Sequence, residues 1–169
     1  MLFRSKSTTA TIFKIDLTAT GADVKFTTTN GQIKVNLGAS AEIIGKDYTT
    51  CPTYYLKDGA VTVASQVGVD TATCNTTTAT SVNSAAITFA GADFSAEYVV
   101  PAGTTKTLSL VVDTTTAITG AGNVVVTVGT GSMNDAGAVT AGDISWSDGI
   151  YDPITWVDSP SITSGTMTF

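Results

Sequence analysis

Apolar and polar residues alternate with a period of two along most of this 169-residue chain. The segment 13–18 reads FKIDLT and the segment 32–37 reads QIKVNL, so every second side chain is apolar. Such alternation is typical of strands that bury one face and expose the other to solvent. No segment shows the 3.6-residue period of an amphipathic helix over a useful length. The pattern therefore predicts an all-β chain.

Turn-forming residues separate the segments that resemble strands. Asn30-Gly31 precedes the segment 32–37, and Asn-Gly is favoured in two-residue hairpin turns. Asp58-Gly59 and Pro101-Ala102-Gly103 lie between further pairs of segments. We expect hairpins around 30–31 and 58–59. The expected strands cover 11–17, 24–28, 32–37, 53–57, 60–65, 94–100, 105–112, 123–128, 143–146, 154–157 and 166–169.

The spacing of these segments predicts how they pack. Strands that recur every 8 to 12 residues or so, without helices between them, favour an antiparallel sandwich or barrel over βαβ units. The length suits one domain with a sizeable core and is short for two. We therefore expect a single β-sandwich domain over residues 1–169, with about seven to nine strands. Residues 1–10 are the candidate for an extended N-terminal arm.

Composition and charge exclude several function classes. Thr makes up about a fifth of the chain, and there is no His, so the usual zinc sites and His-dependent nucleophile systems cannot be built from it. The net charge is −6 and Arg4 is the single Arg, which argues against nucleic-acid binding. No apolar run approaches the roughly 18 residues of a membrane-spanning helix. We expect no enzyme activity, no cofactor and no membrane span.

Cys51 and Cys74 are the only thiols, and they lie in Thr- and Asn-rich surroundings. We predict that they form a disulfide, since exposed free thiols would be a liability in an exported protein. Closing that loop would contribute roughly 3 kcal/mol. Two unrelated thiols are the alternative. Asn75 begins a glycosylation sequon, which also arises by chance in a Thr-rich chain.

Short segments at both ends and in the middle of the chain carry a family resemblance. Residues 53–59 (TYYLKDG) and 99–110 (VVPAGTTKTLSL) are similar to the motifs YLYDG and IPAGTTKTLTV. The start FRSKST resembles RSKPT, with Ser7 in place of the usual Pro, and the segments 143–149 and 156–169 are similar to WSDG and LPVTGNTLSF. These motifs occur in immunoglobulin-like β-sandwich domains of large, Thr-rich, S-layer-like surface proteins of Patescibacteria. The resemblance implies an immunoglobulin-like fold and a place outside the cell or on its surface.

These observations predict a structural extracellular protein that assembles with copies of itself into a surface layer or filament. Along the N-terminal segment, Thr11, Phe13, Ile15 and Leu17 alternate with more polar residues and could fill a neighbour's groove as an assembly strand. The other interpretation makes this segment the first strand of its own sandwich, as the resemblance implies.

A surface adhesin or carbohydrate-binding module, with a glycan as its partner, is the alternative function. Trp146, Tyr151 and Trp156 could form an aromatic platform for a sugar ring, although they could equally be core or interface anchors. The Asp residues of segment 143–152 match no known calcium-loop spacing, so we interpret them as turn formers and expect no metal site.

Overall fold

The computed structural model describes residues 8–39, 53–67, 84–113, 123–128, 143–155 and 167–168. These residues form twelve β-strands and one short 3-10 helix. Seven strands have six or more residues, and the other five have two or three. In chain order the elements are β1 (Thr9–Thr18), β2 (Val24–Phe26), β3 (Gln32–Ala39), β4 (Thr53–Asp58), β5 (Val61–Val67), β6 (Ser84–Ala90), η1 (Gly91–Asp93), β7 (Tyr98–Val100), β8 (Thr105–Asp113), β9 (Asn123–Val128), β10 (Ile144–Trp146), β11 (Ile154–Thr155) and β12 (Met167–Thr168).

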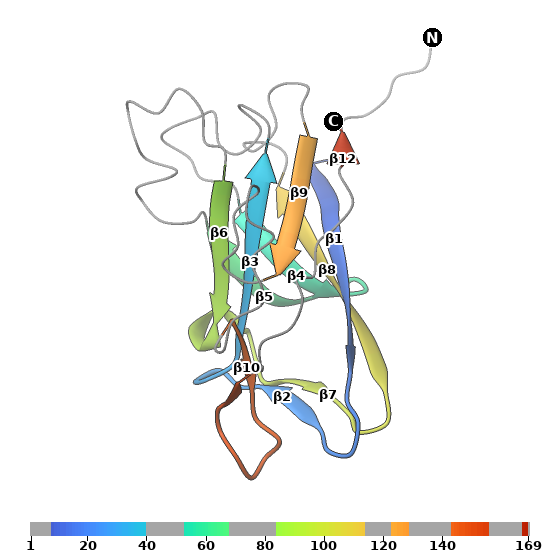
Figure 1. The fold of residues 1–169 in the computed structure, drawn as a ribbon, viewed down its shortest axis with the longest axis vertical. Helices are drawn as coiled ribbons and strands as arrows, with labels where there is room; N and C mark the ends of the chain where they lie inside the picture. Colours follow the sequence, from blue (N-terminus) through green and yellow to red (C-terminus); the bar gives the residue numbers. More distant parts are fainter. Residues whose placement is uncertain are drawn as a thin grey trace.

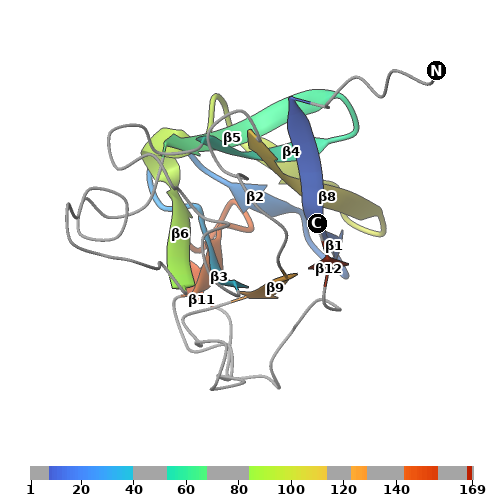
Figure 2. The same cartoon turned by 90° about the horizontal axis from the view of Figure 1, so that it is seen from above.

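The strands form two packed sheets and a small ribbon (Figure 1). The first sheet has the order β1-β8-β4-β5, and the ribbon is β2-β7. In the second sheet β3 pairs with β6 on one edge, while β9 and β10 share the other edge and continue to β12 and β11. All pairings are antiparallel, and the view from above separates the sheets into two layers (Figure 2). The predicted all-β sandwich is confirmed.

The alternating apolar residues of both sheets meet in one core between the layers. Ile33, Val35 and Leu37 of β3 are at most 2% exposed, and Leu56 and Leu108 of the first sheet are equally buried. At about 25 cal/mol per Å² of apolar surface, this burial is the main favourable contribution to folding. In the described ranges, no helix is long and apolar enough to cross a membrane.

Strand β1 belongs to the first sheet of its own chain, where it pairs with β8 from Thr9 to Thr18. Phe13, Ile15 and Leu17 are half-buried and pack against the core, as their alternation predicts. Thr11 departs from the expected apolar face, because it is exposed while Ile12 is buried. The cause is a β-bulge between Thr11 and Phe13, which shifts the phase of the alternation by one residue.

The two expected hairpins have different outcomes. The hairpin expected around 58–59 is confirmed, since β4 and β5 pair across it, but Asp58 still pairs with Val61 and the two turn residues are Gly59 and Ala60. Gly59 has a φ of 60°. The prediction of a hairpin at Asn30-Gly31 is wrong, because β2 pairs with β7, whereas β3 pairs with β6, β9 and β10. Here the chain turns from the ribbon into the second sheet, with the Gly31 N–H donating to the Thr27 carbonyl at 3.0 Å. A Cβ at Gly31 would lie 2.7 Å from that oxygen, which explains the glycine.

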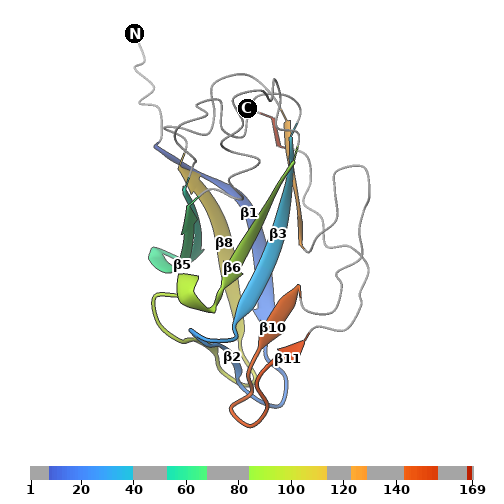
Figure 3. The ribbon, with the colours of Figure 1, turned by 90° about the vertical axis from the view of Figure 1, so that its left-hand side faces the viewer.

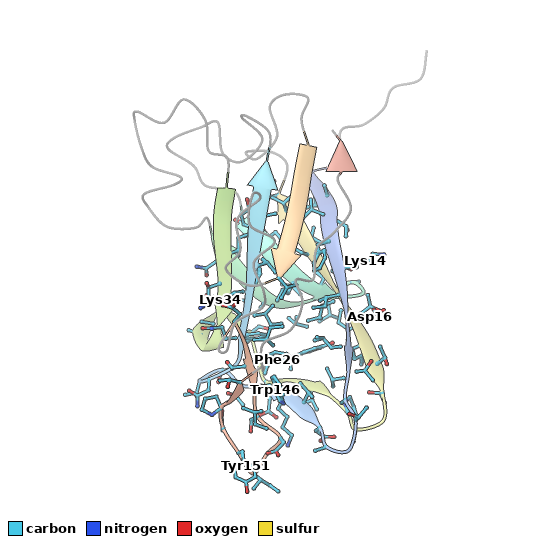
Figure 4. All side chains as sticks on the ribbon, viewed as in Figure 1. Lys14, Asp16, Phe26, Lys34, Trp146 and Tyr151 are labelled. Atoms are coloured by element: carbon cyan, nitrogen blue, oxygen red, sulfur yellow. The ribbon has the colours of Figure 1, made fainter. Side chains whose placement is uncertain are left out.

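An aromatic cluster lies beside the ribbon β2-β7, and Figure 4 places its Phe26 in the lower half of the molecule. The Phe26 ring of β2 stacks on Phe94, with ring centroids 5.8 Å apart, and lies 6.4 Å from the Tyr98 ring of β7. The Tyr98 hydroxyl donates to Asp58 at 3.2 Å, and Lys106 forms an ion pair with the same carboxylate at 3.1 Å. Burial, followed by the Asp58 charge, raises the pKa of Tyr98. The ribbon is thereby held against the first sheet.

Replacing Phe26 with Ala tests this cluster. Phe26 is 1% exposed, so F26A removes a buried ring and leaves a cavity, and we expect a loss of about 3 to 5 kcal/mol in the free energy of unfolding. The matched variant V61A alters a side chain that is 65% exposed and should change that free energy by no more than about 0.5 kcal/mol. Chemical denaturation measures both, and equal effects would contradict the packing described.

Candidate interaction site

The loop between β10 and β11 forms the lower tip of the molecule (Figure 3). It carries two adjacent side chains with large apolar parts, Ile150 and Tyr151, and Figure 4 shows Tyr151 at the tip. Ile150 is 84% exposed and Tyr151 is 68% exposed. Val61, at the β4–β5 turn, is the other large hydrophobic residue exposed in the described part of the chain. Isolated surface apolar residues are common, so the distinguishing feature of this loop is that two of them are adjacent. We call residues 147–153 the tip loop.

The tip loop is anchored to the sandwich on two sides. Lys25 of β2 and Ser147 exchange backbone hydrogen bonds of 2.8 Å in both directions. The Ser145 hydroxyl donates to the Asn30 carbonyl at 2.8 Å, and β10 pairs with β3 through Ile144 and Ser145. The side view shows the β10–β11 hairpin continuing downward from the second sheet (Figure 3). The base of the loop is therefore part of the folded body.

Within the tip loop, side-chain oxygens satisfy the backbone N–H groups of the turn. Asp148 Oδ1 accepts hydrogen bonds from the N–H groups of Ile150 and Tyr151, both at 2.7 Å. The Ser147 hydroxyl accepts from the N–H of Gly149 at 3.0 Å. Gly149 has a φ of 92°, a conformation that L side chains rarely adopt. One carboxylate thus holds the backbone of both exposed apolar residues.

The charge of Asp148 contributes to this arrangement. Hydrogen bonds from the N–H groups of Tyr151 and Ile150 lower the pKa of the Asp148 carboxyl below its ordinary value, and the Lys25 ammonium acts in the same direction. A side chain at Gly149 would lie 3.1 Å from Lys25 Nζ, so this ammonium is close to the loop. The carboxylate form of Asp148 therefore favours the observed turn.

Of the three aromatic residues that were candidates for a sugar-binding platform, the structure describes two, and these two have different surroundings. Trp146 is half-buried and packs against the core near Phe26, whereas Tyr151 projects from the tip (Figure 4). Trp156 lies outside the described residues. Tyr151 is accordingly the exposed ring of this set in the described structure, and Trp146 has the position of a core anchor.

The Asp residues of this region also have separate partners. Asp143 is buried, and its carboxylate lies 3.5 Å from Lys34 Nζ on β3. Asp148 bonds to its own loop, as described above, while Asp152 is exposed. Among the residues that the structure describes, no three acidic, Cys or His side chains are grouped as metal ligands would be. Asp148 thus stabilises its own turn, and the Asp143 carboxylate pairs with a lysine of β3.

Other residues singled out in the sequence fall elsewhere. Cys51, Cys74 and Asn75 lie outside the described residues, so the disulfide stays a prediction. Ile150, the most exposed of the large apolar side chains described, was not identified from the sequence. The available signal was an Asp-Gly turn pair followed directly by two apolar residues, since turns usually carry polar side chains.

Comparisons with protein-family models, with curated proteins and with solved structures found no match.

The dependence of the tip loop on Asp148 is testable by NMR. The pKa of the Asp148 carboxyl is lower in the folded protein than in the unfolded protein. The stabilisation of the loop is therefore complete at pH values above the unfolded-state pKa, and it disappears as the pH falls through the folded-state pKa. We expect the amide signals of Ile150 and Tyr151 to titrate with a midpoint below that of an ordinary aspartate.

The variants D148A and D148N separate the acceptor from its charge. D148A should make the amides of Ile150 and Tyr151 exchange rapidly with solvent, whereas D148N retains an acceptor oxygen and should preserve part of their protection. Unchanged protection in D148A would show that another group holds the loop.

Proposed function

We propose that this protein is a structural, self-assembling subunit of an extracellular surface layer or filament. Its sandwich would be of the immunoglobulin-like type, and a Cys51–Cys74 disulfide would fit an exported chain. The function would lie in association between copies, with no chemical step. This proposal extends the sequence resemblance, which implied the fold type and the cell-surface location.

The observation that carries the proposal is the tip loop, where Ile150 and Tyr151 are exposed on an ordered turn. An interface residue that is already held in place loses less conformational entropy on binding than one in a mobile loop. Tyr is also enriched at protein interfaces, because its ring is apolar and its hydroxyl can form a hydrogen bond. Two such residues at one end of an elongated body suit end contacts between subunits.

Carbohydrate binding is the second candidate function, and the exposed Tyr151 ring supports it. Aromatic faces pack on sugar rings, and Asp148 and Asp152 on the same loop are oxygen acceptors for hydroxyl groups. A tip that binds glycans would need a soluble subunit with an accessible Tyr151. A tip that joins subunits would cover that ring in the assembly.

The variant I150S/Y151S distinguishes these functions by electron microscopy of purified protein. Under the proposal, the wild-type protein forms filaments or lattices, and the variant gives dispersed particles because its apolar contact is lost. The matched control V61S makes the same polarity change at a side chain 65% exposed on the β4–β5 turn, and it should assemble like wild type.

Circular dichroism verifies that both variants keep their β structure. Ordered assemblies that persist in I150S/Y151S would contradict the role of the tip loop. Dispersed wild-type particles that bind immobilised oligosaccharides, with loss of binding in Y151S alone, would favour the carbohydrate-binding function instead.

A further inference from the structure

Strand β1 forms one edge of the first sheet. Its pairing partner among the described residues is β8. On its inner face Phe13, Ile15 and Leu17 are half-buried, and on its outer face Lys14 and Asp16 are exposed. Figure 4 places Lys14 and Asp16 on this outer strand. An edge strand offers backbone donors and acceptors to another strand.

The hydrogen bonds at the end of β1 indicate which backbone groups face that edge. The Ala19 N–H donates to the Thr104 carbonyl at 3.0 Å, and the Ala19 carbonyl accepts from the Gly103 N–H at 2.8 Å. Ala19 therefore directs both of its groups toward the β8 side. In an antiparallel strand this direction alternates from residue to residue. Hence the N–H and C=O groups of Lys14, Asp16 and Thr18 point to the edge.

We infer that a second copy of this chain binds this edge through its own β1, in an antiparallel pairing centred on Ile15. The inference rests on the proposed function and names one interface of the assembly. In this register Lys14 lies opposite Asp16 of the second copy, and Asp16 lies opposite Lys14 of the second copy. These residues carry the edge-directed backbone groups, so they form hydrogen-bonded pairs in the new ladder.

The charges on the outer face select this register over its neighbours. The neighbouring registers that still pair the edge-directed groups are reached by sliding one strand along the other by two residues, in either direction. One such shift places Lys14 opposite Lys14, and the other places Asp16 opposite Asp16. Like charges directly opposite each other destabilise a strand pair, and opposite charges stabilise it. The pairing centred on Ile15 contains two opposite-charge pairs and no like-charge pair at these positions.

The inner face of β1 supports the same register. Ile15 lies opposite Ile15 of the second copy, and Phe13 lies opposite Leu17. These half-buried side chains pack against the core at the sheet edge, so a neighbouring strand would cover more of their apolar surface. The bulge between Thr11 and Phe13 interrupts the strand, which limits the regular pairing to residues 13–17 of both copies.

Mixed disulfide cross-linking tests the register with two variants, K14C and D16C. In the inferred pairing, the thiol that K14C introduces in one chain faces the thiol that D16C introduces in the other. They lie across a hydrogen-bonded pair with about 5.5 Å between Cα atoms, which a disulfide can span. Identical positions are diagonal neighbours about 7 to 8 Å apart, beyond the usual disulfide range. The mixed dimer also keeps one Lys14–Asp16 pair.

Oxidation with diamide followed by non-reducing electrophoresis gives the readout, with wild type as the control for the native cysteines. We expect the equimolar mixture to yield at least several-fold more dimer than either variant alone or wild type. The inference is overturned if each variant alone cross-links as well as the mixture, or if the mixture gives no dimer above wild type.

The result is independent of the test for the proposed function. Wild-type protein that polymerises without the mixed cross-link contradicts the β1 pairing and leaves the proposed function standing. A mixed cross-link in protein that never polymerises supports the pairing and contradicts the proposed function. As a second measurement, the charge swap K14D/D16K should restore the dimer affinity that K14D alone lowers, since it regenerates both opposite-charge pairs.

Discussion

The backbone pairing of β3 on both of its edges is the constraint on which the rest of the structure depends. β6 occupies one edge of β3, and β9 and β10 divide the other edge between them. Ile33, Val35 and Leu37 fix the register, because a slip by one residue would turn these buried side chains to the opposite face. Such a slip would also displace β10, and with it the tip loop. The register of β3 therefore determines both the packing of the core and the position of the tip loop.

The two proposed contacts lie on different parts of the sandwich and have different consequences. Pairing of β1 with β1 has two-fold symmetry, so it yields a closed dimer. An additional contact through Ile150 and Tyr151 would join such dimers, and two independent interfaces can generate an extended assembly. The polar groups of β1 would supply the register, while the apolar tip would supply contact area. Neither contact requires the sandwich to change its fold.

The alternation of apolar and polar residues predicted most of the longer strands, because a half-buried strand places apolar residues at its buried positions and polar residues at its exposed positions. Strand partners were less predictable: the Asn30-Gly31 turn suggested a hairpin, yet the strands beside it joined different sheets. Strand β6 was not expected, since in Ser84–Ala90 only Ile87 and Phe89 are large apolar residues. The tip contact depends on how far Ile150 projects from the body, which a local pattern does not reveal.

Self-association of the unmodified protein is the central claim, and sedimentation velocity over a range of concentrations tests it most directly. We expect the weight-average sedimentation coefficient to rise with concentration as monomers form dimers and then larger species. High salt should weaken the dimer step, because it screens the exposed Lys14–Asp16 pairs. A single species of monomer mass at every concentration and salt condition would contradict the account.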